Sequence, residues 1–83
     1  MLIHSPKELA LLVISERKTH KLSQADVADR VGLKQKTISA FENKPEAAKL
    51  DTIFRILSAV DLDIRLLSKD KALASTSGWR EEW

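Results

Sequence analysis

Five polar side chains lie close together near the middle of the chain, and their types are those that hydrogen-bond to nucleic acid. They are Lys34, Gln35, Lys36, Thr37 and Ser39. Amides, ammonium groups and hydroxyls bond to base edges and to phosphate oxygens in DNA complexes. A helical face that is merely solvated would be expected to carry more glutamate, and this stretch is acidic only at Glu42, at its far end. The residues therefore predict a DNA-contacting surface.

Two short helices joined by a tight turn would hold this surface outward, and residues 23–42 have the required pattern. Ser23 is placed to cap the first helix, with Asp26 three residues on as a capping-box partner. Gly32 falls where the chain must turn, because glycine tolerates a positive φ at little cost. The apolar residues of the inner faces are Val27, Ala28, Val31, Leu33, Ile38 and Phe41. The pattern predicts a helix-turn-helix, and an ordinary helical hairpin is the alternative.

The segment resembles the Xre/Cro/phage-repressor helix-turn-helix family over roughly residues 6–60. Members of that family share a Gln opening the first helix, an Ala and a Gly at these spacings, and a Gln opening the second helix, as Gln24, Ala28, Gly32 and Gln35 do here. The resemblance implies that Gln24 contacts a phosphate and braces Gln35, and that Gln35 reads a base in the major groove.

The composition argues against several other classes of protein. The chain has 83 residues, which predicts one small domain, and it has no cysteine, so disulfides and thiolate metal sites are excluded. His4 and His20 are too few and too far apart for a metal site, and no cofactor is expected. The sequence lacks a glycine-rich phosphate loop and a glycine-flanked nucleophile, so we do not expect an enzyme.

The charge pattern fits sequence-specific binding better than general DNA coating. The formal net charge is only +2, which is modest for a nucleic-acid binder. Within residues 30–44, however, the basic residues form a local patch on the predicted reading helix: Arg30, Lys34, Lys36 and Lys44. No apolar run approaches the ~18 residues of a membrane span and no signal peptide is visible, so the expected location is the cytoplasm, without membrane association.

Helices are predicted on both sides of the motif. The first begins after Ser5, a capping residue followed by proline, and runs to about Lys18. The fourth runs from about Leu50 to Val60, and Lys49 at its start is a poor cap. Its inward-facing residues are expected to be Leu50, Ile53, Phe54 and Leu57.

Residues 61–67, DLDIRLL, alternate with a period of two, which predicts a strand. Leu62, Ile64 and Leu66 share one face of this strand. A single strand has nothing in its own chain to pair with and would leave an open edge. We therefore expect pairing with a second copy across a twofold axis, which gives a homodimer whose two reading helices face a palindromic operator. A fifth helix of poor quality is the alternative.

Residues 68–83 turn polar and small, so we expect a domain of residues 1–67 followed by a flexible tail of residues 68–83. The two tryptophans of the chain, Trp79 and Trp83, lie in this tail. A tryptophan on a flexible tether is a typical anchor for a partner's pocket. Alternatively, one of them folds back onto the core or is incidental.

The chain as a whole is similar to the HipB-type antitoxins, in its S-P helix start, the stretch KQKTISAFENKP, the strand, and the Glu-Trp after it. The similarity implies a mostly α fold with four helices, a homodimer joined by an intermolecular two-stranded sheet, repression of its own operon, and a partner toxin of the HipA serine/threonine kinase type. Trp83 would be the toxin anchor. The base-contacting residues would be Lys34, Gln35, Lys36 and Ser39, with Gln24 and Thr37 on phosphates.

Two departures from that family are visible. Lys36 replaces a small residue often found there, which indicates a different operator, and the fourth helix lacks the usual Thr cap. Two other functions share some of these features. A stand-alone transcription regulator would differ only in the role of the tail, and a protein-interaction adaptor would use the helix pair to bind protein.

Overall fold

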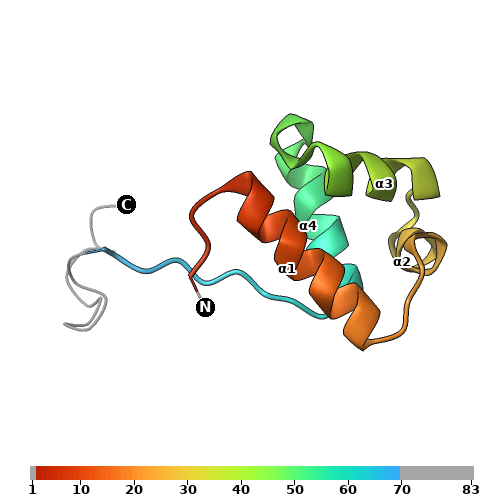
Figure 1. The fold of residues 1–83 in the computed structure, drawn as a ribbon, viewed down its shortest axis with the longest axis horizontal. Coiled ribbons are helices and arrows are strands. Elements are labelled where there is room, and N and C mark those ends of the chain that lie inside the picture. Colours follow the sequence, from red (N-terminus) through yellow and green to blue (C-terminus); the bar gives the residue numbers. More distant parts are fainter. Residues whose placement is uncertain (1, 70–83) are drawn as a thin grey trace.

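Four α-helices and one 3₁₀ turn make up the part of the chain that the computed structural model describes, residues 2–69 (Figure 1). They are α1 (Pro6–Thr19), α2 (Gln24–Val31), α3 (Gln35–Asn43), η1 (Pro45–Ala47) and α4 (Leu50–Ala59). Helix α2 packs against α3 and α4, and α1 packs against α3 and η1. The mostly α, four-helix architecture predicted from the sequence is confirmed.

Local hydrogen bonds and backbone conformation determine where helix α1 begins and ends. The Ser5 side chain accepts a hydrogen bond from the Glu8 backbone N–H at 3.1 Å, as predicted for a capping residue. The Glu8 carboxylate reaches one residue further back than a capping box requires and accepts from the His4 N–H at 2.6 Å. The helix stops where Lys21 takes a left-handed conformation with φ 58°, so that the Leu22 N–H donates to the Arg17 carbonyl at 2.9 Å.

The turn between α2 and α3 forms as the sequence predicts. Ser23 and Asp26 make both hydrogen bonds of a capping box, at 3.0 and 2.8 Å. Gly32 ends α2 in the left-handed conformation with φ 69°, and the Leu33 N–H then donates to the Ala28 carbonyl at 2.9 Å. A Cβ added at Gly32 would meet nothing within 4 Å. Glycine is therefore favoured there by backbone conformation and not by lack of space.

The core draws on all four helices. Its fully buried large side chains are Val13, Val27, Ile38, Phe41, Ile56 and Val60. Three of these, from α2 and α3, are the inner-face residues that the helix-turn-helix pattern predicts. Burying the inner faces of both helices together fixes their crossing, and it leaves the opposite face of α3 free to carry polar residues.

Helix α4 is turned differently from the prediction. Leu57 is buried as expected, but Leu50 is 64% exposed and Phe54 is 50% exposed, so the prediction is wrong for these two residues. Ile56 and Val60 take their place in the core. The reason is that α4 is apolar on two neighbouring stripes, and a single chain has enough inner surface to cover only one of them.

The chain leaves α4 as an extended trace directed away from the helices (Figure 1). Asp61 is not part of the extended segment, because it ends the helix in the left-handed region with φ 62° and sets the Leu62 N–H against the Leu57 carbonyl at 2.9 Å. Residues 62–68 have no regular secondary structure. The alternative of a fifth helix at 61–67 is therefore wrong.

Within residues 2–69 the single chain forms no strand, so the strand predicted at 61–67 is absent from an isolated copy. Pairing between two copies remains a prediction. Trp79 and Trp83 lie outside the described residues. In the same described stretch, no helix is long and apolar enough to cross a membrane, and no three histidine, cysteine or acidic residues group as a metal site would need.

Candidate nucleic-acid interface

Helix α3 carries the predicted contact residues on the side opposite its buried face. Ile38 and Phe41 fix that buried face in the core. Three of the predicted residues are exposed, namely Lys34, Gln35 and Lys36. Two are half-buried, namely Thr37 and Ser39. The exposed members of the predicted set therefore lie at the start of α3.

The first turn of α3 also offers free backbone donors. Lys34 occupies the N-cap position and makes no side-chain capping bond. The Thr37 N–H donates to the Lys34 carbonyl at 2.9 Å, whereas the N–H groups of Gln35 and Lys36 have no hydrogen-bond partner among residues 2–69. Such a helix start combines unpaired donors with the positive end of the helix dipole. It can bind a phosphate group.

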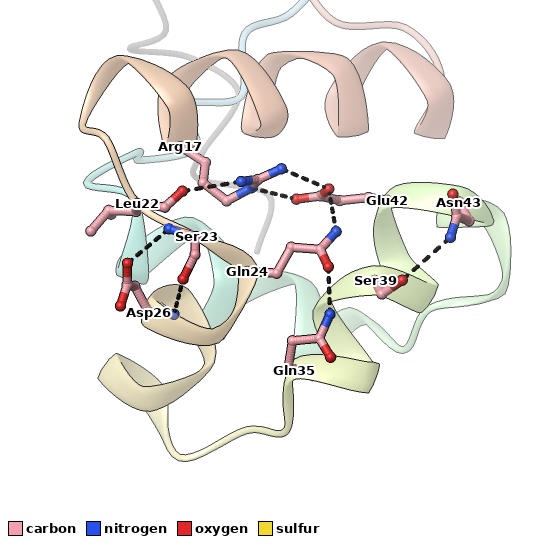
Figure 2. A network of polar contacts seen from close by, with 9 residues as sticks. All are labelled: Arg17, Leu22, Ser23, Gln24, Asp26, Gln35, Ser39, Glu42 and Asn43. Atoms are coloured by element: carbon pink, nitrogen blue, oxygen red, sulfur yellow. Dashed lines mark hydrogen bonds and ion pairs between the residues drawn. The ribbon is translucent and has the colours of Figure 1, made fainter.

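A chain of polar contacts links this surface to α1 (Figure 2). The Arg17 guanidinium donates to both oxygens of the Glu42 carboxylate, at 2.8 and 3.1 Å, and to the Leu22 carbonyl at 3.0 Å. The Gln24 amide nitrogen donates to the same carboxylate at 2.9 Å. The Gln35 amide nitrogen then donates to the Gln24 carbonyl oxygen at 2.6 Å. We call Arg17, Glu42, Gln24 and Gln35 the polar relay.

The polar relay sets the direction of both glutamine amides. An ionised carboxylate can only accept hydrogen bonds, so Glu42 requires the nitrogen end of Gln24. The oxygen end of Gln24 consequently faces Gln35 and requires the nitrogen end of that amide. Figure 2 shows the Gln35 oxygen turned away from Gln24. Gln35 thus presents a hydrogen-bond acceptor, together with its second amide hydrogen, to whatever lies against α3.

Sequence reasoning missed the inner half of the polar relay. It treated Glu42 as an isolated acid at the far end of the reading helix, whereas the Glu42 side chain is 7% exposed and pairs with Arg17, itself 12% exposed. The two residues are 25 positions apart, so no helical or strand period links them. The contact between Gln24 and Gln35, expected from the family resemblance, is present.

The basic residues predicted to form one patch do not all lie together in the structure. Arg30 does not join the exposed lysines, because its guanidinium donates to the Ala59 carbonyl at 2.9 Å near the end of α4. Lys44 is exposed just beyond α3. Ala40 and Asn43 are also exposed on α3, and sequence reasoning did not single them out.

The acid at the start of α2 serves the helix cap. Hydrogen bonds to the Ser23 backbone and side chain hold the pKa of the Asp26 carboxyl below its ordinary value of 3.8, and the nearby Arg30 charge acts in the same direction. Asp26 is therefore ionised at neutral pH and keeps both bonds of the capping box. The cap fixes where α2 begins, and with it the position of Gln24 in the first turn.

Comparison with known proteins places this geometry in a family. The model of the helix-turn-helix family, HTH_3, matches residues 13–67. The antitoxin HipB of Escherichia coli strain K12 is 37% identical over 82 residues, covering 98% of this chain and 93% of that protein. The antitoxin HigA1 of Mycobacterium tuberculosis strain H37Rv is 37% identical over 73 residues, but these span only 49% of its length.

Solved structures of HipB share the fold. A structure described as a HipA-HipB-O2-O3 complex superposes with a TM-score of 0.80 at 36% identity, covering 83% of this chain and 97% of the other. A HipB-O4 20mer complex gives the same TM-score, identity and coverage. The contact geometry of α2 and α3 and these likenesses lead to one assignment: the chain belongs to the helix-turn-helix family of DNA-binding proteins, among the non-enzymatic HipB-type antitoxins of toxin-antitoxin systems.

Proposed function

We propose that this protein is a homodimeric antitoxin and transcriptional autorepressor. It binds a palindromic operator through the recognition helix at residues 34–42, and it binds and neutralises a serine/threonine kinase toxin of the HipA type. The observation that carries the DNA-binding part is the outward amide of Gln35, held in one direction by the polar relay.

The direction of the Gln35 amide suits a base edge that offers a donor beside an acceptor. Gln35 presents its oxygen and still has one amide hydrogen to donate, which is the arrangement that reads adenine in the major groove. The exposed Lys34 and Lys36 lie on either side of it. Together with the unpaired N–H groups of the first turn, these lysines are suited to phosphate contacts that position the helix.

Replacing Gln35 tests the reading function directly. In a gel-shift titration on the natural operator, Gln35→Ala should weaken binding by roughly 1–3 kcal/mol and relax selectivity at one base pair in each half-site. Lys7→Ala, a change at an exposed residue in the first turn of α1, serves as the control and should bind as the parent does. Unchanged operator selectivity in Gln35→Ala would contradict this assignment.

The homodimer is supported by the apolar surface that a single copy leaves uncovered. Phe54 and Leu57 of α4 and Ile64 of the extended segment border an open hollow of about 580 Å³. The exposed side chains Leu50, Leu66 and Leu67 are 64%, 81% and 52% exposed. Leu50 and Phe54 lie four residues apart on α4, so their exposed side chains share one face of that helix. A second copy would cover this face.

Because Phe54 is half exposed in the single chain, changing it should weaken association without unfolding the helices. Phe54→Glu should sediment as a folded monomer at concentrations where the parent is a dimer. Leu11→Glu places the same charge at a comparably exposed apolar residue of α1 (56%), and it should remain dimeric. If both variants stay dimeric, α4 does not contribute to the interface.

The toxin-binding part rests on the relatives and on the tail. The chain covers 93% of the length of an antitoxin HipB, and a related solved structure is described as a HipA-HipB-O2-O3 complex. Trp79 and Trp83, outside the described residues, supply large aromatic anchors on a polar stretch. The alternative is a stand-alone regulator of the Xre type, which the DNA-facing surface fits equally well because that surface lies wholly within residues 2–69.

Co-purification distinguishes the antitoxin from the stand-alone regulator. A HipA-type kinase encoded beside this gene should be retained by the full chain and lose its autophosphorylation in the complex. Trp83→Ala should release the kinase while binding operator normally, and Trp79→Ala tests the second anchor in the same way. Full kinase activity in the presence of excess antitoxin would favour the stand-alone regulator.

A further inference from the structure

We propose that residues 62–66 of two copies pair antiparallel with Ile64 opposite its own copy, so that Asp63 of each protomer lies opposite the partner's Arg65. This inference rests on the homodimer proposed above and adds to it the register of the interface. It makes the extended segment selective for an identical chain, because each protomer supplies one acid and one base to a reciprocal pair.

The segment has what such pairing needs. It has no regular secondary structure in the single chain. The Leu62 N–H donates to the Leu57 carbonyl, but the backbone groups of residues 63–66 form no hydrogen bond within residues 2–69 and are available to a neighbour. Leu62 packs against the core, whereas Ile64 is 45% exposed and Leu66 is 81% exposed. Asp63 and Arg65 are exposed, and neither joins any of the ion pairs formed within residues 2–69.

Symmetry restricts the possible registers. A twofold axis that relates two adjacent antiparallel strands stands normal to the sheet, so it keeps each side chain on the same face. Residues directly opposite each other in an antiparallel pair also lie on one face. Two residues that lie opposite each other must therefore both have odd numbers or both have even numbers. It follows that one residue of the segment lies opposite the same residue of the partner. Near the middle of this segment that residue is Asp63, Ile64 or Arg65.

Charge decides among the three. Centring the axis on Asp63 sets two aspartates against each other, and centring it on Arg65 sets two arginines against each other. Like charges directly opposite destabilise a strand pair, whereas opposite charges stabilise it. Centring the axis on Ile64 forms the pair between Asp63 and the partner's Arg65 twice, once on each side of the axis.

The same register gives the most exposed apolar side chain a place to pack. It puts Leu66 opposite the partner's Leu62. In each protomer Leu62 packs on the core and borders, with Phe54, the hollow described above. Leu66 would thus lie over α4 of the other protomer. With the axis at Asp63, Leu66 would instead face the partner's Val60, which is fully buried at the end of α4.

Cysteine cross-linking reads the register directly, because the chain has no cysteine of its own. Directly opposite Cβ atoms lie about 4.5–5.5 Å apart and diagonal residues about 7–8 Å apart, and a disulfide needs about 3.5–4.5 Å. Under mild oxidation of the full chain, Ile64→Cys should form covalent dimers at least tenfold faster than Asp63→Cys or Arg65→Cys, since only a nearly opposed pair can close with small movements.

The outcomes separate the register from the dimer. Faster cross-linking at position 63 or 65, or at none of the three in a chain that sediments as a dimer, would overturn the register and leave the homodimer standing. A parent chain that sediments as a monomer at high concentration would overturn both.

A charge exchange gives an independent test. Asp63→Arg and Arg65→Asp should each raise the dissociation constant of the homodimer by about tenfold or more, because each creates two like-charge pairs. An equal mixture of the two variants restores both opposite-charge pairs and should form a heterodimer with a dissociation constant near that of the parent. A mixture that associates no more tightly than either variant alone would contradict the proposal.

Discussion

Gln24 and Glu42, eighteen residues apart, are joined by a hydrogen bond of 2.9 Å in which the amide nitrogen is the donor and the carboxylate is the acceptor. This bond determines which end of Gln24 faces Gln35, and therefore which end of Gln35 faces outward (Figure 2). A residue on the inner side of α3 thus controls which hydrogen-bonding groups Gln35 presents outward. Arg17 holds that residue in place from α1.

Glu42→Gln should lower both stability and operator selectivity. The change leaves the Arg17 guanidinium, 12% exposed, without its charge partner, which should reduce the free energy of unfolding by roughly 3 kcal/mol. A glutamine can also present either end to Gln24, so the Gln35 amide is no longer held in one direction. Urea unfolding measures the first effect. Titration against operators changed at the base pair read by Gln35 measures the second.

Removing both members of the ion pair separates stability from positioning. Arg17→Met together with Glu42→Met replaces the pair by apolar side chains of similar length, so most of the stability lost in Glu42→Gln should return. Selectivity should stay low, because Gln24 still lacks its acceptor. If the double variant reads the operator as the parent does, the polar relay does not orient Gln35.

Lys36→Ala should weaken DNA binding evenly across operator sequences if Lys36 contacts phosphate. In a homodimer the change would leave one phosphate in each half-site without its lysine. The slope of log affinity against log salt should therefore fall by about 0.9 for each phosphate that is no longer neutralised. Lys34→Ala should behave in the same way. A change in base preference without a change in salt slope would instead identify Lys36 as a base-reading residue, as the family resemblance implies.

Much of the helix-turn-helix could be predicted because its signals are local. The Ser23–Asp26 capping box and the left-handed Gly32 each depend on residues within a few positions, and both formed as expected. The exposure of Lys34, Gln35 and Lys36 follows from the apolar spacing that buries the other side of α3.

What could not be predicted depends on contacts between distant segments. The bonds from Arg17 to Glu42 and from Arg30 to Ala59 span 25 and 29 residues, and no period in the sequence connects their ends. The orientation of α4 was also mispredicted at Leu50 and Phe54, since the helix has more apolar surface than one chain covers. Periodicity shows that a helix is apolar, but only packing decides which of two apolar stripes faces the core.

Two of the three left-handed helix ends, those at Gly32 and Lys21, should respond in opposite directions to substitution. Gly32→Ala forces a Cβ into the φ 69° conformation and should lower the free energy of unfolding by about 1 kcal/mol, although the space around it is open. Lys21→Gly relieves the same strain at φ 58°. This change should raise the free energy of unfolding by a similar amount or less. Thermal unfolding of both variants checks this. Equal shifts of the same sign would contradict the conformational explanation.

Helix α4 can be stabilised at its start. Lys49 is the N-cap residue, and its side chain makes no capping bond although its backbone is already extended, with ψ 146°. Lys49→Thr supplies a side-chain oxygen that can accept from the free N–H groups of the first turn, so the free energy of unfolding should rise by about 0.5–1 kcal/mol. Lys49→Ala serves as the matched control and should gain little. The comparison requires equal protein concentration, because α4 also belongs to the proposed dimer interface.

Acid should remove the contribution of the Asp26 cap. The pKa of this carboxyl is lowered in the folded protein, because the Ser23 hydrogen bonds favour the charged form. Asp26 therefore stabilises the fold fully above its ordinary value of 3.8. That contribution is lost as the pH falls below this value through the lower folded pKa.

Asp26→Ala should unfold at a lower temperature than the parent at pH 7. This difference in unfolding temperature should disappear as the pH is taken below about 3.8. The matched change Asp29→Ala, at an exposed residue of the same helix that makes no capping bond, controls for the loss of a carboxylate from α2. If the difference in unfolding temperature between the parent and Asp26→Ala is constant from pH 7 to pH 2, the charge of Asp26 does not stabilise α2.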